Sequence, residues 1–211
     1  MTYQDVLRVL ARVRGGAAAI AGPGILSRLL WATRHEPATI YQMELGYPTA
    51  LSLGLALARP EERVVALEGD GSMLAGLGVL TTVARYRPAH LVVLVCDNGV
   101  YGTVGPGTVE TATRHGADLA AIARGCGWDE EKVVTVESEE QTAAALSRAW
   151  KRPGPWLIVA RVGHTSTDAV GSIGQIPFDI VEGAIAFRRE MINRDRSGRS
   201  MLRSQNTRGP Q

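Results

Sequence analysis

The sequence predicts an α/β fold, a doubly wound and mostly parallel sheet with helices on both faces. Short apolar runs rich in β-branched residues alternate with Ala- and Leu-rich segments of helical period. Short connections containing glycine or proline separate these segments. Several of the apolar runs have no polar face, as is expected of parallel strands that helices cover on both sides.

The predicted strands follow one another along the chain as AAAIAG (17–22), TIYQ (39–42), RVVALEG (63–69), HLVVLVCD (90–97), KVVTVE (132–137) and PWLIVARV (155–162). Helical periodicity predicts helices over 4–14, 25–34, 48–58, 73–86, 117–125, 139–151 and 178–192. Ser72 stands where the N-cap of the fourth helix is expected. In a sheet of this kind ligands bind beyond the carboxyl ends of the strands, so the residues after each strand are the candidate site.

Composition limits the class of protein. The chain has 211 residues, of which 45% are hydrophobic and 21% charged, which fits one globular domain and excludes a wholly disordered chain. It has no run of about 18 apolar residues that would predict a membrane span. Its first residues have a charged, helix-like pattern rather than that of a secretory signal. Two cysteines cannot form a disulfide scaffold or a four-ligand zinc site. We therefore expect a cytoplasmic protein without a membrane partner.

The end of the chain is basic. Residues 188–211 contain seven arginines but only two carboxylates, Glu190 and Asp195, so the rest of the chain is net acidic. Basic tails can bind nucleic acid or membranes, but a solvated and partly disordered end is the more common case. The sequence thus predicts a domain over residues 1–193 and a basic, disordered tail over 194–211, with no nucleic-acid partner.

A glycine-flanked carboxylate follows the third predicted strand. Gly69-Asp70-Gly71-Ser72 ends that strand and opens a helix, where glycines permit close approach of a ligand and free N–H groups attract an anion. A carboxylate beside a bound phosphate is unfavourable unless a cation lies between them, which favours a divalent metal bridging Asp70 and a phosphate. A plain strand-to-helix turn explains the same four residues equally well.

The fourth predicted strand ends in a second polar group. Asn98 lies 28 residues after Asp70, the length of one helix and one strand, which returns the chain to the same edge of a parallel sheet. Asp70 and Asn98 can then meet on one magnesium ion, which prefers oxygen ligands. The glycine-rich loop 99–107 can wrap a diphosphate, although Asn98-Gly99 is also a common simple turn.

Together, GDGS and CDNGVYG resemble the diphosphate-binding half of thiamine diphosphate enzymes, in which GDG is followed, after the next strand, by an asparagine pair. The first member of that pair is Asp97 here, and the second, Asn98, is the one that coordinates the metal. The resemblance implies that magnesium is bound by Asp70, the side chain of Asn98 and the carbonyl of Val100. It further implies a diphosphate lined by Gly69, Gly71, Ser72, Tyr101 and Gly102.

A second segment is similar to the part of that family that holds the aminopyrimidine ring. Residues 43–58 read MELGYPTALSLGLALA and lead from the second strand into a helix. The resemblance implies that Leu45, directly before Gly46, props the cofactor into its bent conformation. It implies that the carbonyl of Met43 receives the exocyclic amine. Taken alone, the segment is more typical of an ordinary helix-entry loop, and only its combination with the other motif favours a role in cofactor binding.

Within the family, AGPG, LSLGLALA, EGDGSMLAGLGVL and DNGVYGT are similar to the sulfopyruvate decarboxylase β subunit and the matching half of phosphonopyruvate decarboxylase. After Thr103 the sequence departs from the glycine-rich loop of that group. The resemblance implies a non-oxidative 2-oxo acid decarboxylase subunit whose substrate is sulfopyruvate or a similar anionic 2-oxo acid. Its activating glutamate would come from a pyrimidine-binding, α-type partner, because Glu44 and Glu68 lie on the diphosphate-type half. We therefore expect a dimer or a larger hetero-oligomer.

Several alternatives stay open. An acetolactate synthase-like carboligase half would use the same cofactor, and a phosphate-binding regulatory module would use the same turn, although GxGxxG and GxxxxGK[ST] are both absent. No residue of this chain is predicted with certainty to be catalytic. His115, after the glycine-rich loop, is a weak candidate for contact with the substrate carboxylate, and His164 a weaker one.

Overall fold

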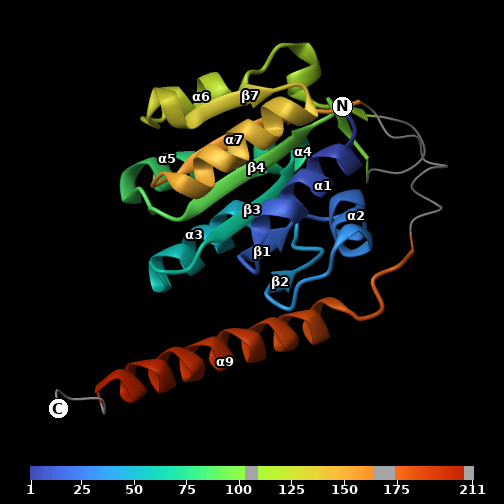
Figure 1. The fold of residues 1–211 in the computed structure, drawn as a ribbon. Coiled ribbons are helices and arrows are strands. Elements are labelled where there is room, and N and C mark those ends of the chain that lie inside the picture. Colours follow the sequence, from blue (N-terminus) through green and yellow to red (C-terminus); the bar gives the residue numbers. More distant parts are fainter. Residues whose placement is uncertain (103–108, 164–173, 207–211) are drawn as a thin grey trace.

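The computed structural model describes residues 1–102, 109–163 and 174–206, with side chains through Ser197, and places one sheet between two layers of helices (Figure 1). The main sheet contains β1 (Ala18–Ala21), β2 (Thr39–Ile40), β3 (Val64–Gly69), β4 (Leu91–Asp97), β7 (Val133–Val136) and β8 (Trp156–Arg161). Their order is β2-β1-β3-β4-β8-β7 and every pair is parallel. The predicted strands and the predicted doubly wound fold are confirmed.

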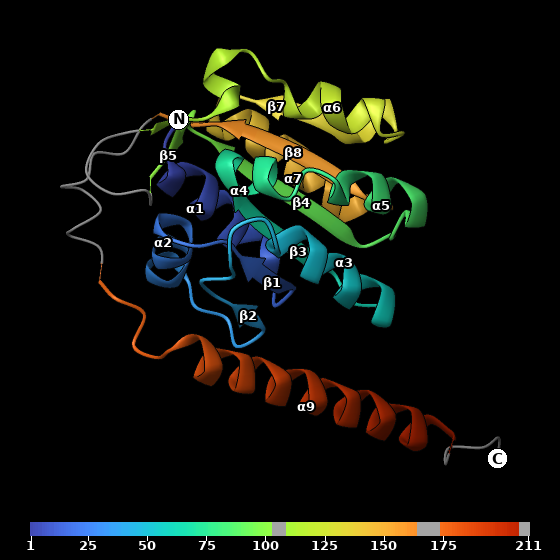
Figure 2. The same cartoon turned by 180° about the vertical axis from the view of Figure 1, so that it is seen from behind.

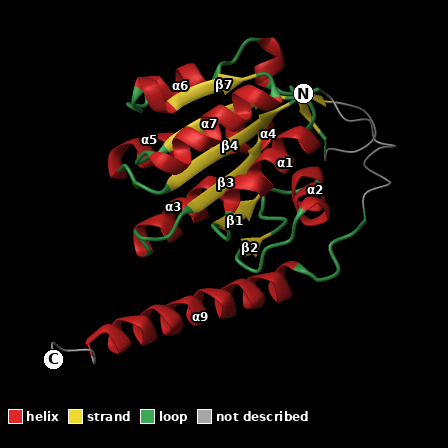
Figure 3. Ribbon diagram, in the orientation of Figure 1, coloured by secondary structure: helices red, strands yellow, loops and turns green. Residues whose placement is uncertain are grey.

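Helices cover both faces of the sheet, as Figure 3 shows by colour. One face packs against α1 (Tyr3–Arg14), α2 (Ile25–Thr33) and α7 (Glu139–Lys151). The opposite face, turned toward the viewer in Figure 2, packs against α3 (Pro48–Ala58), α4 (Asp70–Ala75), α5 (Val79–Tyr86) and α6 (Leu119–Gly125). The central strands β3 and β4 are almost fully buried, because apolar side chains point into both layers.

The prediction of one continuous helix over 73–86 is wrong. The structure breaks it into α4 and α5, with α4 ending at Gly76. A Cβ atom at Gly76 would overlap the carbonyl oxygen of Gly46, so the break allows the two backbones to approach closely. The predicted N-cap role of Ser72 is also wrong. The helix begins at Asp70, three residues before the predicted start, with Gly69 as its N-cap, and Ser72 lies inside it.

The last helix is longer than predicted. Helix α9 (Ile180–Asn206) continues past the predicted helix end at 192 and runs along the β2 edge of the sheet (Figure 1). Arg194 donates hydrogen bonds to the Gly16 carbonyl at 2.8 Å and to Glu62 at 3.1 Å, and Arg59 donates one to Asp195 at 2.6 Å. Arg194 and Asp195, the first residues after the predicted boundary, are therefore bonded to the body of the domain. Residues 207–211 lie outside the described range.

Four short elements were not predicted. Strands β5 (Val100–Tyr101) and β6 (Val109–Glu110) form an antiparallel hairpin, and 3₁₀ turns occupy η1 (Ala112–His115) and η2 (Glu130–Lys132). Part of the predicted diphosphate loop, residues 103–108, lies outside the described range, as does His164. Across the part of the chain that is described, no helix has both the length and the apolar character needed to cross a membrane.

The burial of β4 generates a stability prediction. Leu94→Ala removes a fully buried side chain from the centre of the sheet and should lower the free energy of unfolding by about 2–5 kcal/mol. Leu57→Ala makes the same chemical change at a side chain that is 44% exposed and should cost about 0.5 kcal/mol or less. Urea denaturation measures both values. Similar losses for the two variants would contradict the assigned core.

Candidate functional site

Asp70 and Asn98, the two residues predicted to bind one metal ion, lie close together at the carboxyl ends of β3 and β4. These strands pair with Gly69 opposite Cys96, so the residues that follow leave the sheet side by side. The backbone N–H of Asn98 donates a hydrogen bond to Asp70 Oδ1 at 3.4 Å. The Asn98 side-chain oxygen accepts a hydrogen bond from the Val100 N–H at 3.1 Å, so all three predicted metal-binding residues lie in one region.

Asp70 is a buried carboxylate held by donors from a third segment. Its side chain accepts hydrogen bonds from the hydroxyls of Thr111 and Thr113, and the residue is only 1% exposed. Burial raises the pKa of Asp70 above its usual range; the Thr111 hydrogen bond opposes this rise, and nearby Asp97 adds to it. A cation at Asp70 would therefore relieve an unfavourable accumulation of negative charge.

Asp97 is the second carboxylate of this region. It accepts hydrogen bonds from Thr113 Oγ1 at 2.7 Å and from the Gly99 N–H at 3.2 Å. Arg161 Nη1 lies 3.7 Å from Asp97 Oδ2 and balances part of its charge. Asp97 thus shapes the turn that presents Asn98. The two threonines were missed by the sequence analysis, because nothing in their spacing distinguishes them from other loop threonines.

No cluster of three or more His, Cys, Asp and Glu side chains is arranged to hold a metal among the described residues. A metal at this place would need amide, backbone and ligand oxygens in addition to Asp70. Such an all-oxygen set suits magnesium, which commonly takes one or two carboxylates and completes its shell with phosphate and water. The donors at the β3 and β4 ends therefore fit a magnesium–diphosphate group.

Gly71 and Tyr101 form a tight contact beside Asp70. A Cβ atom at Gly71 would overlap the Tyr101 ring, so only glycine allows the β5 hairpin to pack against the start of α4. Gly69 precedes α4 as its N-cap, and a Cβ at Gly102 would meet no atom within 4 Å. Gly69, Gly71 and Ser72 thus belong to the start of α4, and the Tyr101 ring packs against it.

A buried hydrogen-bond network joins this turn to the segment predicted to hold the ring. Ser72 Oγ donates to Glu68 Oε2 at 2.6 Å and accepts from the Gly46 N–H at 3.0 Å. The other Glu68 oxygen accepts from the Thr49 N–H at 2.8 Å and from its hydroxyl. Burial raises the pKa of Glu68, and these hydrogen bonds oppose the rise. Glu68 therefore ties β3, α4 and α3 together, a role that the sequence analysis missed.

The ring-holding segment lies where β2 ends. The Met43 N–H donates to the Ala21 carbonyl at 2.9 Å, which fixes this residue against β1. Gly46 has a φ of 84°, a conformation that favours glycine, and packs against Gly76. Leu45, which directly precedes Gly46, is 40% exposed. The structure therefore brings Met43, Leu45 and Gly46 to the same sheet edge as Asp70.

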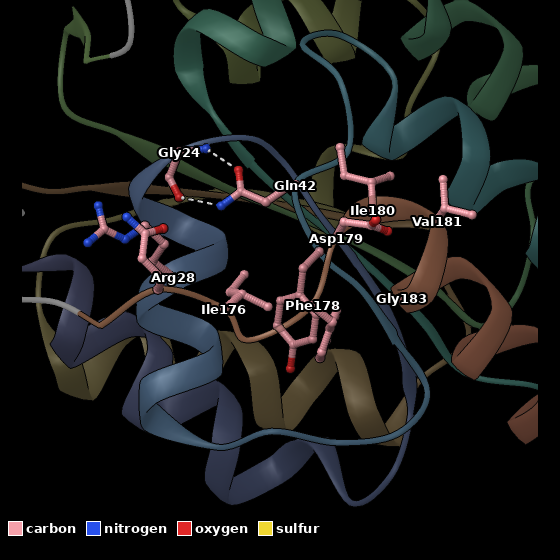
Figure 4. Close-up of a pocket in the computed structure, with 11 residues that line it drawn as sticks. Gly24, Arg28, Gln42, Ile176, Phe178, Asp179, Ile180, Val181 and Gly183 are labelled. Carbon is pink, nitrogen blue, oxygen red and sulfur yellow. Dashed lines mark hydrogen bonds between the residues drawn. The ribbon is translucent and has the colours of Figure 1, made fainter.

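A cavity of about 730 Å³ opens beside this segment, between the start of α2 and the residues leading into α9 (Figure 4). Gln42 lines the cavity. The Gln42 side chain accepts a hydrogen bond from the Gly24 N–H at 2.8 Å and donates one to the Gly24 carbonyl at 3.3 Å. Gln42 has a φ of 56°, which is uncommon for a residue other than glycine. Arg28, Phe178 and Asp179 also line the cavity. The sequence alone could not predict it, because its walls come from distant segments.

His115, the weak catalytic candidate, lies on the exposed side of η1. Its Nε2 is 2.9 Å from Glu110 Oε2, and 68% of its side chain is accessible. Its ion-pair partner is therefore Glu110, in β6 of the hairpin, rather than Asp70. The candidate cofactor residues, in contrast, all lie at one edge of the sheet.

Comparison with known proteins places the chain in a family. The chain belongs to the family described as thiamine pyrophosphate enzyme, C-terminal TPP binding domain, whose model matches residues 26–160. Thiamine pyrophosphate is another name for thiamine diphosphate, so the family predicted from the sequence is confirmed.

Two named relatives match most of the chain. Phosphonopyruvate decarboxylase of Streptomyces viridochromogenes is 34% identical over 182 residues, which are 85% of this chain and 44% of that protein. Sulfopyruvate decarboxylase subunit beta of Methanococcus maripaludis is 29% identical over 182 residues, which are 85% of this chain and 94% of that subunit. The chain therefore spans less than half of the first relative but nearly all of the second.

A solved structure agrees with the fold. A structure described as that of a thiamin diphosphate-dependent enzyme from Mycobacterium smegmatis superposes with a TM-score of 0.62 and 27% identity. The superposition covers 78% of this chain and 32% of that one. The layered sheet described above thus matches about a third of that chain in fold.

The contact between Gly71 and Tyr101 generates a prediction. Gly71→Ala should lower the free energy of unfolding by about 1–3 kcal/mol, because the added methyl group displaces the ring. Combined with Tyr101→Ala, it should cost less than the sum of the two single changes. Urea denaturation of the three variants measures this coupling. Gly125→Ala, where a Cβ meets no atom within 4 Å, is the control. Strictly additive losses would contradict the contact.

Proposed function

We propose that this chain is the diphosphate-binding subunit of a thiamine diphosphate- and magnesium-dependent, non-oxidative 2-oxo acid decarboxylase. The observation that carries the proposal is the proximity of Asp70 and Asn98 at neighbouring strand ends in a chain of this family. The relatives named phosphonopyruvate decarboxylase and sulfopyruvate decarboxylase subunit beta support decarboxylation of an anionic 2-oxo acid such as sulfopyruvate.

In this proposal magnesium is held by Asp70, the Asn98 side chain and the Val100 carbonyl. Burial and the nearby Asp97 disfavour a bare carboxylate at Asp70, so a divalent cation would stabilise its ionised form. The backbone around Gly69, Gly71 and Ser72 and the hairpin residues Tyr101 and Gly102 would line the diphosphate. The first turn of α4 offers N–H groups to its oxygens.

The opposite end of the cofactor would lie against the 43–46 segment. The Met43 carbonyl would accept a hydrogen bond from the ring amine, and Leu45 would support the bend next to Gly46. Gln42, which directly precedes Met43, is itself held in place by hydrogen bonds to both backbone groups of Gly24. The cavity beside Gln42 has a volume typical of small-molecule sites, which are about 300–1,000 Å³.

When bound, thiamine diphosphate supplies the nucleophilic carbon and the electron sink for loss of carbon dioxide. The residues of this chain bind the cofactor, orient it and shield one side of it from water. None of them needs to act as a nucleophile. Glu68 is committed to Thr49 and Ser72 and is not free to protonate the ring, which supports a glutamate supplied by another chain.

The relatives that match this chain over nearly their whole length are named beta subunits, which implies a partner subunit. We propose that this partner is an α-type chain with the pyrimidine-binding domain, and that the assembly is a hetero-oligomer with the site between chains. A cytoplasmic location stays a prediction from the sequence.

Removing the Asp70 charge tests the metal site. Asp70→Asn keeps the shape of the side chain and an oxygen for Thr111 and Thr113, but it removes the charge that attracts magnesium. We expect at least tenfold weaker magnesium-dependent binding of thiamine diphosphate, about 1.4 kcal/mol, in equilibrium dialysis. Asp118→Asn, at the N-cap of α6, makes the same chemical change elsewhere and should bind as the wild type does. Unchanged affinity in Asp70→Asn would contradict the site.

The division of the site between chains is tested by activity. Purified alone, this chain should bind magnesium and thiamine diphosphate weakly and release no carbon dioxide from sulfopyruvate or phosphonopyruvate, because the activating glutamate is absent. Co-expression with the pyrimidine-binding chain should restore release, as followed by a carbon dioxide assay. Full turnover by the isolated chain would refute the proposed division.

A further inference from the structure

The two oxygens of the Asp70 carboxylate have different hydrogen-bond partners. Oδ2 accepts hydrogen bonds from the hydroxyls of Thr111 and Thr113, the latter at 3.0 Å. Among the described residues, Oδ1 accepts only the backbone N–H of Asn98, at 3.4 Å. Two donors are thus committed to Oδ2, whereas Oδ1, the oxygen bonded to Asn98, keeps the capacity for a further partner.

Thr111 uses its side chain for the carboxylate rather than for its own turn. It is the N-cap residue of η1, a place where a threonine hydroxyl commonly accepts a hydrogen bond from the first helical turn. The Thr111 hydroxyl makes no such bond with η1 and donates to Asp70 instead. The Thr111 backbone N–H donates to the Gly99 carbonyl at 2.9 Å, which ties this segment to the turn that presents Asn98.

Thr113 joins the two carboxylates of the site. Its Oγ1 lies 3.0 Å from Asp70 Oδ2, 2.7 Å from Asp97 Oδ1 and 2.9 Å from Thr111 Oγ1. Because a hydroxyl has one proton, Thr113 can donate to only one carboxylate at a time, and Thr111 is the donor devoted to Asp70. Both threonines are buried. The pair therefore restricts rotation of the Asp70 carboxylate.

The number of carboxylate oxygens offered to an ion distinguishes magnesium from calcium. Magnesium is small and demands near-octahedral geometry, whereas calcium takes more oxygen ligands in flexible geometry and often binds both oxygens of one carboxylate. At Asp70, both oxygens can contact an ion only if Oδ2 gives up its threonine donors. Those buried hydroxyls would then lose their acceptor, which costs free energy. The arrangement therefore favours contact through Oδ1 alone.

We propose that Thr111 and Thr113 are positioning residues that keep Asp70 Oδ2 engaged, so that only Oδ1 is offered to the ion, and thereby favour magnesium over calcium. The inference rests on the proposed function, because it concerns the same metal site. It assigns a role in ion selectivity to two side chains outside the predicted set of ligands. A purely structural role for the two hydroxyls predicts a loss of stability without a change in the preferred ion.

Thr111→Val tests the proposal with little disturbance. Valine keeps the β-branched shape and suits the extended backbone of Thr111, with φ −86° and ψ 167°, but it lacks the hydroxyl. Equilibrium dialysis of thiamine diphosphate against the full chain, with magnesium or calcium as the only divalent ion, gives two affinities. We expect the magnesium-supported affinity to fall about tenfold and the calcium-supported affinity to change about threefold or less.

Matched variants separate positioning from structure. Thr111→Ser keeps the hydroxyl and should keep the magnesium preference of the wild type, and Thr113→Val should shift the preference in the same direction as Thr111→Val. Thr142→Val removes a fully buried hydroxyl in α7, which donates to the Ser138 carbonyl at 2.8 Å, and should leave both affinities unchanged. Melting curves establish that each variant is folded. Equal losses with the two ions, no loss in either threonine-to-valine variant at the site, or no recovery in Thr111→Ser would overturn the proposal.

The outcome for ion selectivity can be separated from the outcome for the enzyme. If the wild type binds thiamine diphosphate with magnesium and Thr111→Val has the same ion preference, the positioning role fails and the proposed function stands. If Thr111→Val loses the preference but the complex with the pyrimidine-binding chain releases no carbon dioxide from any 2-oxo acid, the positioning role stands and the proposed decarboxylase fails. If the wild type binds the cofactor with neither ion, both fail.

Discussion

The parallel pairing of β3 with β4 is the constraint on which the candidate site depends. Glu68 lies opposite Val95 and Gly69 opposite Cys96, so both strands end at the same edge. Asp70 and Asn98 then leave the sheet as neighbours, and one backbone hydrogen bond already joins them. A slip of the pairing by one residue would turn these strand ends to opposite faces and separate the two groups.

Around Asp70 and Asn98, buried polar groups form hydrogen bonds between elements, whereas glycines permit close packing. Glu68 is 1% exposed, and a buried carboxyl group is costly unless donors satisfy it. Thr49 and Ser72 provide those donors and thereby connect three elements at the sheet edge. Gly46, Gly71 and Gly76 allow backbones and the Tyr101 ring to approach where a side chain would not fit.

Local pattern predicted the strands and the residues at their ends, because buried parallel strands have an apolar signature and the GDG and Asn98 segments follow them directly. What failed depends on distant contacts. The break at Gly76 is required by Gly46, thirty positions earlier, and Ser72 serves Glu68 and Gly46 rather than a helix end. Helix α9 extends past its predicted end, and there Arg194 bonds to Gly16 and Glu62, which are distant in the sequence.

The central claim is that one divalent ion, carrying a diphosphate, sits between Asp70 and Asn98. The most direct measurement is the anomalous difference map of crystals grown with thiamine diphosphate and manganese, which replaces magnesium at oxygen sites. The account predicts a single strong peak in contact with the Asp70 carboxylate and the Asn98 side-chain oxygen. A manganese peak away from both residues, or a bound cofactor whose diphosphate lies at another edge of the sheet, would contradict it.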